Sequence, residues 1–378
     1  MVSSEEMKKK DKMSSTTSTP FSNNVFMTFA IVGIFIHLIF ALYYVPSYQT
    51  CSEDYQYNDT KLAHIKKHNN GDHEYRFVVI TDLDHHSKVQ NSKKPKWESY
   101  MKYGKLIINK QKTSAKVFWD DGNVISISSD ISAGGRGMEL SDLAVFDGNL
   151  ITVDDRTGLL YKIIDNKAYP WIFLNDGPGN TLKGIKGEWM TVKDKHLYVG
   201  GLGKEWTTTE GVFVNYHPMF VKVISPSGSV KHLNWTDNFI NIRDAVGIKY
   251  PGYMIHESVQ WSDVHHQWFF MPRRASNETY TEATDEFMGT NYMIIADEDF
   301  TNIKYKKIGK TGDGSRGYSA FQFVPETNDD IIVTLKSEEK DGVPVASYLS
   351  VYCLSTEKVI LDETPLSGTF KYEGIEFV

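Results

Sequence analysis

The chain has 378 residues, of which 40% are hydrophobic and 13% aromatic, so it can bury a large core and disorder cannot describe most of it. Its formal net charge of −7, with acidic and basic residues well mixed, excludes the basic footprint that nucleic-acid binding requires. Two cysteines are too few for a disulfide framework. We expect Cys353 to be a buried thiol, and Cys51 is a candidate for an intermolecular bridge.

The N-terminal region is predicted to anchor the chain in a membrane. A polar tail at 1–24 contains Lys8, Lys9, Lys10 and Lys12, and an apolar stretch follows at 25–45. At 1.5 Å per residue this stretch spans about 30 Å, enough to cross a bilayer as one helix. The lysines precede the helix and acidic residues follow it, so the N-terminus is expected in the cytoplasm. This predicts a single-pass type II protein of the endoplasmic reticulum or Golgi. A cleaved signal peptide is the alternative.

Residues 46–73 are polar and irregular, and they are predicted to form a stem on the lumenal side of the membrane. Three Asn-x-Thr triplets lie on that side, beginning at Asn58, Asn234 and Asn277. They are candidate N-glycosylation sites.

From residue 74 to residue 378 the chain is predicted to be one all-β domain. About twenty short alternating runs follow one another with turn residues and no helices between them. Five segments share a pattern in which a Glu or Ser precedes apolar residues two and four positions later. Their spacing suits blades of four strands, and therefore predicts a five-bladed β-propeller. The segments begin at Ser141, Glu188, Glu257, Ser319 and Glu373.

The last segment supports the closed ring, because the chain ends at Val378 with only one strand of that blade made. The blade must then be completed from the N-terminal side, by residues 75–81 and the two strands that follow. A β-sandwich, which also tolerates a final lone strand, is the alternative.

The first residues of the five segments are expected to meet on the propeller axis, because the first strand of each blade lines the central channel. Three carboxylates gathered there repel one another unless they are protonated or share a cation. All-oxygen coordination with room for water suits Ca²⁺ better than Mg²⁺ or Zn²⁺. The candidate metal ligands are therefore Ser141, Glu188, Glu257, Ser319 and Glu373. A solvated channel without a metal is the alternative.

Charged residues follow the second strands of the blades and are expected to gather at the same mouth of the channel. Guanidinium and ammonium groups suit phosphate oxygens, and a carboxylate can orient or deprotonate water, so the combination predicts phosphoanhydride hydrolysis. Trp206 can stack on a nucleobase, and a plain rim aromatic is the alternative. The segments that follow the second strands are 81–84, 153–156, 200–206, 272–274 and 336–338, and Arg136 joins them from the loop before Ser141.

The runs GRGMELSDL, VDDRTG, KGEWMTVKD, LYVGGLGKEWT, PGYMIHES, WFFMPRRAS, LKSEE and KYEGIEF resemble the soluble calcium-activated nucleotidase family of apyrases, in order along residues 74–378. The resemblance implies a five-bladed propeller with one Ca²⁺ in its tunnel, held by the five ring residues named above. It also implies hydrolysis of nucleoside di- and triphosphates, with UDP and GDP favoured. On the matching positions it implies Asp82, Asp84, Arg136 and Asp155 as candidate catalytic residues. Arg156, Lys204 and Arg273 are the candidate substrate-binding residues that it implies, beside the Trp206 named above. Clearing these nucleotides in the secretory pathway would assist glycan synthesis and glycoprotein folding.

Two other functions remain open on the sequence. The first is a non-catalytic, Ca²⁺-stabilised lumenal propeller that binds glycans or proteins, and the second is a glycosidase, which has no use for so many phosphate-binding cations. The nucleotide preference, the aspartate that activates water and the oligomeric state also stay open, a homodimer being one alternative.

Overall fold

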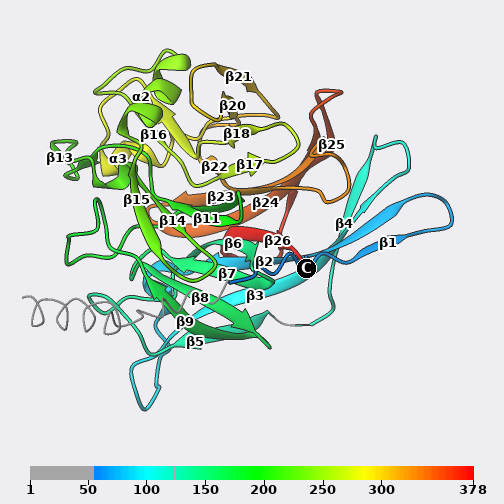
Figure 1. Ribbon diagram of the computed structural model, residues 1–378, viewed down its shortest axis with the longest axis horizontal. Coiled ribbons are helices and arrows are strands. Elements are labelled where there is room, and N and C mark those ends of the chain that lie inside the picture. The colour runs from blue at the N-terminus through cyan, green and yellow to red at the C-terminus, as the bar shows by residue number, and fades with distance from the viewer. Residues whose placement is uncertain (1–54, 123) are drawn as a thin grey trace, which may run out of the picture. The chain divides into compact units, whose positions relative to one another are not determined.

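The computed structural model describes residues 55–378 except residue 123, and these residues form a five-bladed β-propeller (Figure 1). Each blade is an antiparallel sheet. The innermost strands of the blades contact one another in a closed cycle, β6 to β10, β10 to β17, β17 to β22, β22 to β26 and β26 back to β6. The predicted fold is therefore confirmed for the described residues, including the number of blades.

The first four blades are each built from strands that follow one another in the chain, from the axis outwards. Blade 1 contains β6 (Leu140–Phe146), β7 (Asn149–Asp154), β8 (Leu159–Ile164) and β9 (Lys167–Phe173), and blade 2 contains β10 (Trp189–Lys193), β11 (His196–Gly200), β14 (Phe220–Ile224) and β15 (Val230–Asn234). Blade 3 contains β17 (Val259–Ser262), β18 (Gln267–Phe270), β20 (Tyr292–Asp297) and β21 (Ile303–Lys307), and blade 4 contains β22 (Arg316–Phe323), β23 (Ile331–Lys340), β24 (Val343–Cys353) and β25 (Lys358–Pro365).

The fifth blade joins the two ends of the domain, as the sequence predicts. Its inner strand β26 (Lys371–Phe377) pairs with β2 (His73–Asp82), and β2 pairs with β3 (Trp97–Ile108). Both β4 (Ala115–Trp119) and β5 (Ile125–Ser129) then pair with β3. Because the first and last strands of the domain share one sheet, the ring has no open edge at this point.

The inner strands are buried although they alternate polar and apolar residues. In β6 all residues except one are buried, because both faces of the strand are covered by neighbouring blades. The outer strand β9 is mostly exposed. Two-residue turns close several of the hairpins, and both turn residues have positive φ, for example Asp147 (51°) and Gly148 (68°) between β6 and β7. This geometry matches the twist of the strands, and Asp and Gly adopt it readily.

A circle of hydrogen bonds links the five inner strands. Each inner strand contributes one polar side chain that bonds to the next inner strand around the axis. Asp142 accepts from the backbone amide of Met190 (2.6 Å), Thr191 donates to Gln260 (2.9 Å), Gln260 donates to the carbonyl of Phe321 (3.1 Å), Gln322 donates to Glu376 (3.0 Å), and Glu376 accepts from the amide of Val145 (3.1 Å). These hydrogen bonds therefore connect all five blades around the central channel.

Helices also occur, and here the expectation that no helix separates the strands is wrong. Helix α2 (Thr236–Ala245) follows β15, and its buried residues Phe239, Ile242 and Arg243 have the i, i+3, i+4 spacing of one helical face. This face packs between blades 2 and 3, where Phe239 lies among tryptophan side chains. The remaining short elements are β1 (Ile65–Lys67), β12 (Trp206–Thr207), β13 (Phe213–Asn215), β16 (Tyr253–Ile255), β19 (Arg274–Ser276), α3 (Glu282–Asp285), and the 3-10 turns η1 (Asp84–Ser87) and η2 (His217–Met219).

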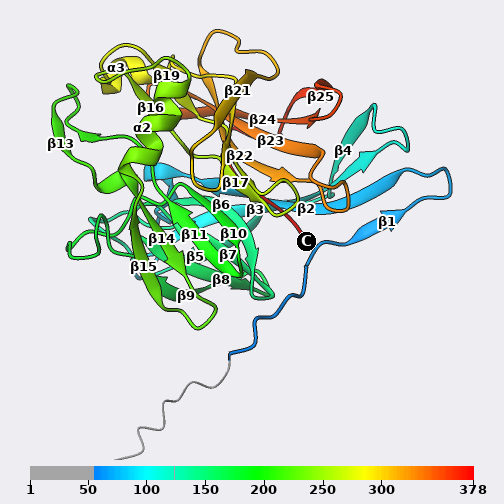
Figure 2. The same cartoon turned by 45° about the horizontal axis from the view of Figure 1, so that its top comes forward.

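The second part of the expected stem packs on the propeller, and the compact unit that contains the propeller extends from Tyr55 to Val378 (Figure 2). The Tyr57 ring lies 5.6 Å from that of Phe146, and β1 pairs with the start of β2. The predicted membrane span at 25–45 and Cys51 lie outside the described residues. Within residues 55–378 no helix has the length and apolar character that crossing a bilayer requires. The predicted thiol Cys353 is free and buried.

Candidate active site

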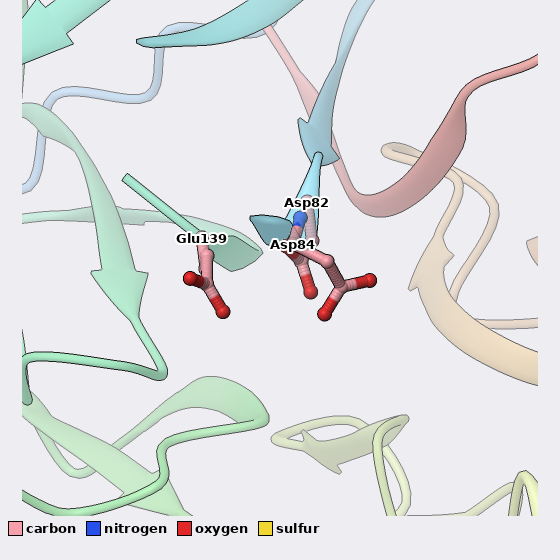
Figure 3. A group of neighbouring side chains, drawn as sticks. All are labelled: Asp82, Asp84 and Glu139. Carbon is pink, nitrogen blue, oxygen red and sulfur yellow. The ribbon is translucent and has the colours of Figure 1, made fainter. Parts of the chain in front are cut away.

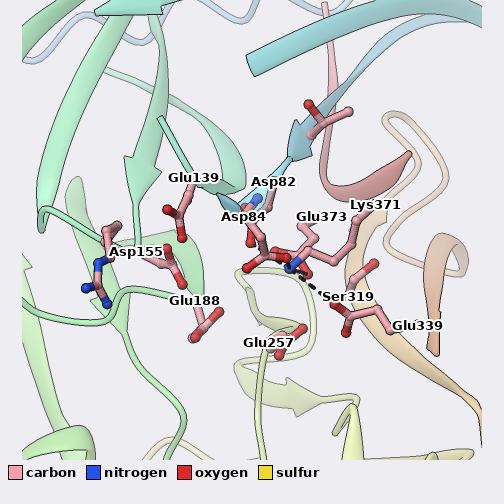
Figure 4. A network of polar contacts seen from close by, with 12 residues as sticks. Asp82, Asp84, Glu139, Asp155, Glu188, Glu257, Ser319, Glu339, Lys371 and Glu373 are labelled. Atoms are coloured by element: carbon pink, nitrogen blue, oxygen red, sulfur yellow. Dashed lines mark hydrogen bonds and ion pairs between the residues drawn. The ribbon is translucent and has the colours of Figure 1, made fainter. Parts of the chain in front are cut away.

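A cavity of about 370 Å³ lies where the inner strands begin, and it gathers charged side chains from several blades (Figure 4). Three predicted ring residues line it: Glu188 immediately precedes β10, Glu257 precedes β17, and Glu373 lies in β26. Acidic residues outnumber basic ones among the lining residues. Carboxylates from blades that are distant in sequence therefore converge, as the repeat predicts.

Two buried ion pairs with Arg273 hold Glu257 and Glu373 close together. The Nη1 atom of Arg273 donates to both Glu257 and Glu373, the latter at 2.7 Å, and Nη2 donates to Glu339. Because one nitrogen atom bonds both carboxylates, Glu257 and Glu373 must face the same point. All these charges are desolvated, so removal of the guanidinium would leave the carboxylates uncompensated.

Lysine ammonium groups neutralise the other carboxylates of the cavity. Lys371 Nζ lies 2.7 Å from oxygens of both Asp82 and Asp84 and 3.5 Å from Glu373. Lys186 Nζ lies 3.0 Å from Glu188 and also pairs with Asp155. Asp82, Asp84, Asp155 and Glu188 thus each have a lysine ammonium group close by.

The electrostatic state of the site is dominated by burial. Burial raises the pKa of Glu188 to about 8, against the opposing effect of Lys186 and with a further increase from Glu257. Burial likewise raises the pKa of Asp82 to about 8, although Lys371 lowers it. The pKa of Glu373 is raised well above its usual value for the same reason. Without additional positive charge, several of these acids would hold protons near neutral pH.

Arg136 connects a second acidic group at the edge of the cavity, formed by Asp82, Asp84 and Glu139 (Figure 3). One carboxylate oxygen from each lies within 4.8 Å of the others. Arg136 Nε donates to Glu139 (2.7 Å) and its Nη2 donates to Asp84 (3.1 Å). Although burial opposes it, the positive charges of Lys371, Lys186 and Arg136 lower the pKa of Asp84 to about 2. Asp84 therefore remains charged.

Three of the predicted ring residues occupy β-bulges. The pairing of the inner strand with its neighbour skips one residue at Ser141 in β6, at Ser319 in β22 and at Glu373 in β26. A bulged residue leaves the ladder, so the backbone carbonyls of Ser141 and Ser319 are candidate oxygen ligands beside their hydroxyls. The Ser319 hydroxyl donates to the carbonyl of Tyr372 (2.9 Å). The Ser141 hydroxyl is buried without a hydrogen-bond partner among the described residues.

The predicted substrate-binding residues have different surroundings. Lys204 is buried in the cavity wall, where its Nζ donates to the carbonyl of Glu205 (2.8 Å) and lies 4.2 Å from the centroid of the Tyr280 ring. Burial lowers its pKa to about 8. Trp206 also lines the cavity, with Lys183 Nζ 4.1 Å from its ring centroid. Arg156 is exposed, and its Nε donates to a loop carbonyl outside the cavity lining (3.4 Å).

Sequence reasoning missed Lys186, Lys371, Glu139 and Glu339, and it also missed Glu282, Asp285 and Glu286 of the cavity lining. A signal was present for three of them. Lys186, Lys371 and Glu139 each lie two positions before a ring residue, and alternate residues of a strand share one face. Glu339 lies near the end of the long strand β23, and only the observed length of that strand brings it to the cavity.

The donor set fits a hard divalent cation. The carboxylates and the bulged serines offer oxygen ligands, and the cavity lining contains no histidine or cysteine among the residues described. Three oxygen atoms at the site, Ser141 Oγ, Asp155 Oδ1 and Glu188 Oε1, are buried without a hydrogen-bond partner in the described structure, although the Lys186 ammonium group lies 3.0 Å from Glu188 Oε1. Flexible coordination by several oxygens is the preference of Ca²⁺.

Comparisons with known proteins give a consistent assignment. The sequence model of the family described as "Apyrase" matches residues 83–378. The chain is 52% identical over 360 residues to "Apyrase apy-1" of Caenorhabditis elegans, a match that covers 95% of this chain and 99% of the relative. It is 48% identical over 323 residues to "Soluble calcium-activated nucleotidase 1" of Rattus norvegicus, covering 85% of this chain and 78% of the relative. A protein of Cimex lectularius named "Apyrase" is 45% identical over 305 residues, covering 80% and 82%.

Proposed function

Since this chain belongs to the apyrase family, we propose that its propeller cavity hydrolyses nucleoside di- and triphosphates in a Ca²⁺-dependent reaction. The observation that carries the proposal is the convergence of Glu188, Glu257 and Glu373 with the cations Lys186, Arg273 and Lys371 on one cavity. An apyrase is a phosphoanhydride hydrolase, and this cavity holds cations that suit phosphate oxygens together with carboxylates that can orient water.

In the proposed reaction, water attacks the terminal phosphorus, a P–O bond to water forms, and the phosphoanhydride P–O bond breaks. UDP then yields UMP and inorganic phosphate. Arg136, Lys204 and Arg273 would bind phosphate oxygens, since guanidinium and ammonium groups donate to them strongly. A carboxylate of Asp82, Asp84 or Asp155 would orient the water and accept its proton. Arg156, on the exposed rim, would contact the nucleotide as it enters.

Bound Ca²⁺ would supply positive charge that stabilises the developing charge on the phosphoryl group. We propose Ser141, Glu188, Glu257, Ser319 and Glu373 as its holders, the serines through hydroxyl or backbone oxygens. The raised pKa values of Glu188 and Glu373 support this assignment, because acids so strongly desolvated require added positive charge to ionise.

We further propose that UDP and GDP are the favoured substrates and that Trp206 stacks on the base. The catalytic domain would lie in the lumen of the endoplasmic reticulum or Golgi, tethered by the helix at 25–45. All three candidate glycosylation residues, Asn58, Asn234 and Asn277, are exposed, which supports a lumenal location. Removal of nucleoside diphosphates there would support glycosylation and glycoprotein folding.

A substrate panel tests the proposal. Phosphate release from UDP, GDP, ADP and ATP would be measured for the purified chain with a calcium chelator and after Ca²⁺ is restored. We expect release that stops with the chelator and returns with Ca²⁺, fastest for UDP and GDP. Glu298→Gln is a matched control, because Glu298 is exposed and pairs with Lys193 outside the cavity lining. Release that is unaffected by chelation would reject the proposal.

A further inference from the structure

Asn234, at the end of β15, holds its amide in a fixed orientation. Its Oδ1 accepts hydrogen bonds from the backbone nitrogen (3.0 Å) and the hydroxyl (2.6 Å) of Thr236. The oxygen and nitrogen of an amide diverge from the same carbon atom in one plane. Because the oxygen bonds to this turn, the nitrogen Nδ2 is directed away from it. The residue is exposed, and Nδ2 is therefore accessible from solvent.

An aromatic groove lies beside this nitrogen. Asn234 lines a cavity of about 470 Å³ together with Tyr216, His217 and Phe220. Phe220 and Asn234 are direct partners in the pairing of β14 with β15, so their side chains stand on the same face of the sheet. The elements β13, β15 and α2 lie on the same side of the propeller in both views (Figures 1 and 2).

The groove continues into an exposed aromatic surface. The rings of Phe213 and Tyr216 lie 4.9 Å apart, and these residues are 42% and 44% exposed. Neighbouring Val212 and Val214 are 62% and 50% exposed. Contiguous apolar surface of this kind usually marks a place that something else covers.

We propose that the groove seats the first sugar of an N-linked glycan carried by Asn234. One face of a hexopyranose presents C–H groups, which pack on aromatic rings, while its hydroxyls face polar groups such as the ring of His217. In the attachment step, Nδ2 of Asn234 forms a bond to C1 of an oligosaccharide held on a lipid pyrophosphate. The C1–O bond to the pyrophosphate breaks, the lipid pyrophosphate leaves, and the amide loses one proton. The inference rests on the lumenal location proposed above.

The other two triplets lack this arrangement. A Cβ added at Gly148 would lie 2.2 Å from Asn58 Nδ2, so that amide is packed against the β6–β7 turn. Asn277 follows β19 and is exposed, but it does not line the aromatic groove. Asn277 therefore offers a matched control, a sugar attached outside the groove.

The test uses the full chain expressed in a eukaryotic cell that glycosylates secretory proteins. Glycopeptide mass spectrometry measures occupancy, and thermal unfolding measures Tm. We expect Asn234 to be occupied and Asn234→Gln to lower Tm by about 2 °C, the scale of one aromatic contact in a domain of this size. Trimming the glycan to one sugar should leave Tm unchanged, and so should Asn277→Gln.

Two groove variants distinguish a sugar that packs in the groove from a sugar that extends into solvent. In Phe220→Leu and in Tyr216→Ser, the second an exposed position that tolerates change, the effect of Asn234→Gln on Tm should disappear. The inference is overturned if Asn277 is occupied and Asn234 is not, or if the Tm effect is undiminished in both backgrounds. If none of Asn58, Asn234 and Asn277 carries sugar, the lumenal location fails with it, whereas sugar on Asn58 alone overturns the inference and leaves the location standing. Phosphate release from UDP is measured on the same samples and reports on the enzymatic proposal separately.

Discussion

Replacement of Arg273 by methionine tests how the site balances its charges. The Arg273 side chain is 6% exposed and bonds to Glu257, Glu373 and Glu339. Methionine keeps much of the apolar volume but removes the guanidinium, so three buried carboxylates lose a shared partner. Breaking a buried ion pair in this way costs about 3–5 kcal/mol. For a domain of this size about 2 °C of Tm corresponds to 1 kcal/mol, so the metal-free variant should unfold about 6–10 °C below the wild type.

Added Ca²⁺ should reverse part of this loss. A ligand that binds only the folded state stabilises it by about 4 kcal/mol at a thousand times its Kd. In Arg273→Met, Glu257 and Glu373 no longer have the guanidinium as a competing partner, so the gain in Tm from Ca²⁺ should exceed that of the wild type. The assay is thermal unfolding, monitored by fluorescence, with chelator and with saturating Ca²⁺.

Arg316→Met provides the matched control. Arg316 also contacts two carboxylates, Glu338 (3.0 Å) and Glu363 (3.2 Å), but its side chain is 36% exposed. Its loss should cost no more than about 1 kcal/mol and leave the Ca²⁺ response unchanged. The reasoning is refuted if Arg273→Met shows the wild-type gain from Ca²⁺, because the cation would then not share the carboxylates that Arg273 holds.

Three further predictions concern the proposed Ca²⁺ ligand Glu188, the proposed stacking of Trp206 on the nucleobase, and the buried channel residue Glu376. Glu188→Gln should weaken Ca²⁺ affinity by about 10- to 100-fold and lower UDP hydrolysis in parallel. The circular dichroism spectrum should be unchanged. If the variant loses activity but keeps its Ca²⁺ affinity, Glu188 is not a Ca²⁺ ligand. Trp206→Leu should raise KM for UDP by about tenfold, which is the effect of losing one base–aromatic stack, with little change in kcat. An unaltered KM would show that Trp206 does not stack on the base. Burial raises the pKa of Glu376 from 4.5 to about 7. The contribution of protonated Glu376 to the free energy of unfolding is therefore fully present below pH 4.5. It is lost as pH rises to about 7, and this loss is at most about 3 kcal/mol. Urea unfolding of Glu376→Gln across this range should show a flatter pH dependence than the wild type, and an identical slope would exclude Glu376 as the source.

The blade repeat could be predicted because it depends on local alternation and on one recurring position. The five ring residues lie in the inner strands or just before them, and the lone strand at Val378 required an N-terminal partner, which β2 provides. Helix α2 was missed because only Phe239, Ile242 and Arg243 of its ten residues face the core. Such a short apolar stripe in a polar segment gives little periodic signal.

Part of the site depends on register, which the sequence does not display. The bulges at Ser141, Ser319 and Glu373 arise from how each inner strand pairs with its neighbour. The bonds of Arg273 to glutamates from three different strands or loops likewise follow from the closed ring. Lys186 and Lys371 were visible as charges two residues before a ring glutamate, but nothing local indicated that Lys371 would be buried or that both would pair with carboxylates of the cavity.

Calorimetric titration of Ca²⁺ into the metal-free chain tests the central claim most directly. We predict binding of one Ca²⁺ per chain, weakened alike by Glu188→Gln and Glu373→Gln although these residues belong to different blades. Glu298→Gln should leave the isotherm unchanged. No measurable binding, or binding that both ring variants leave intact, would contradict the shared site.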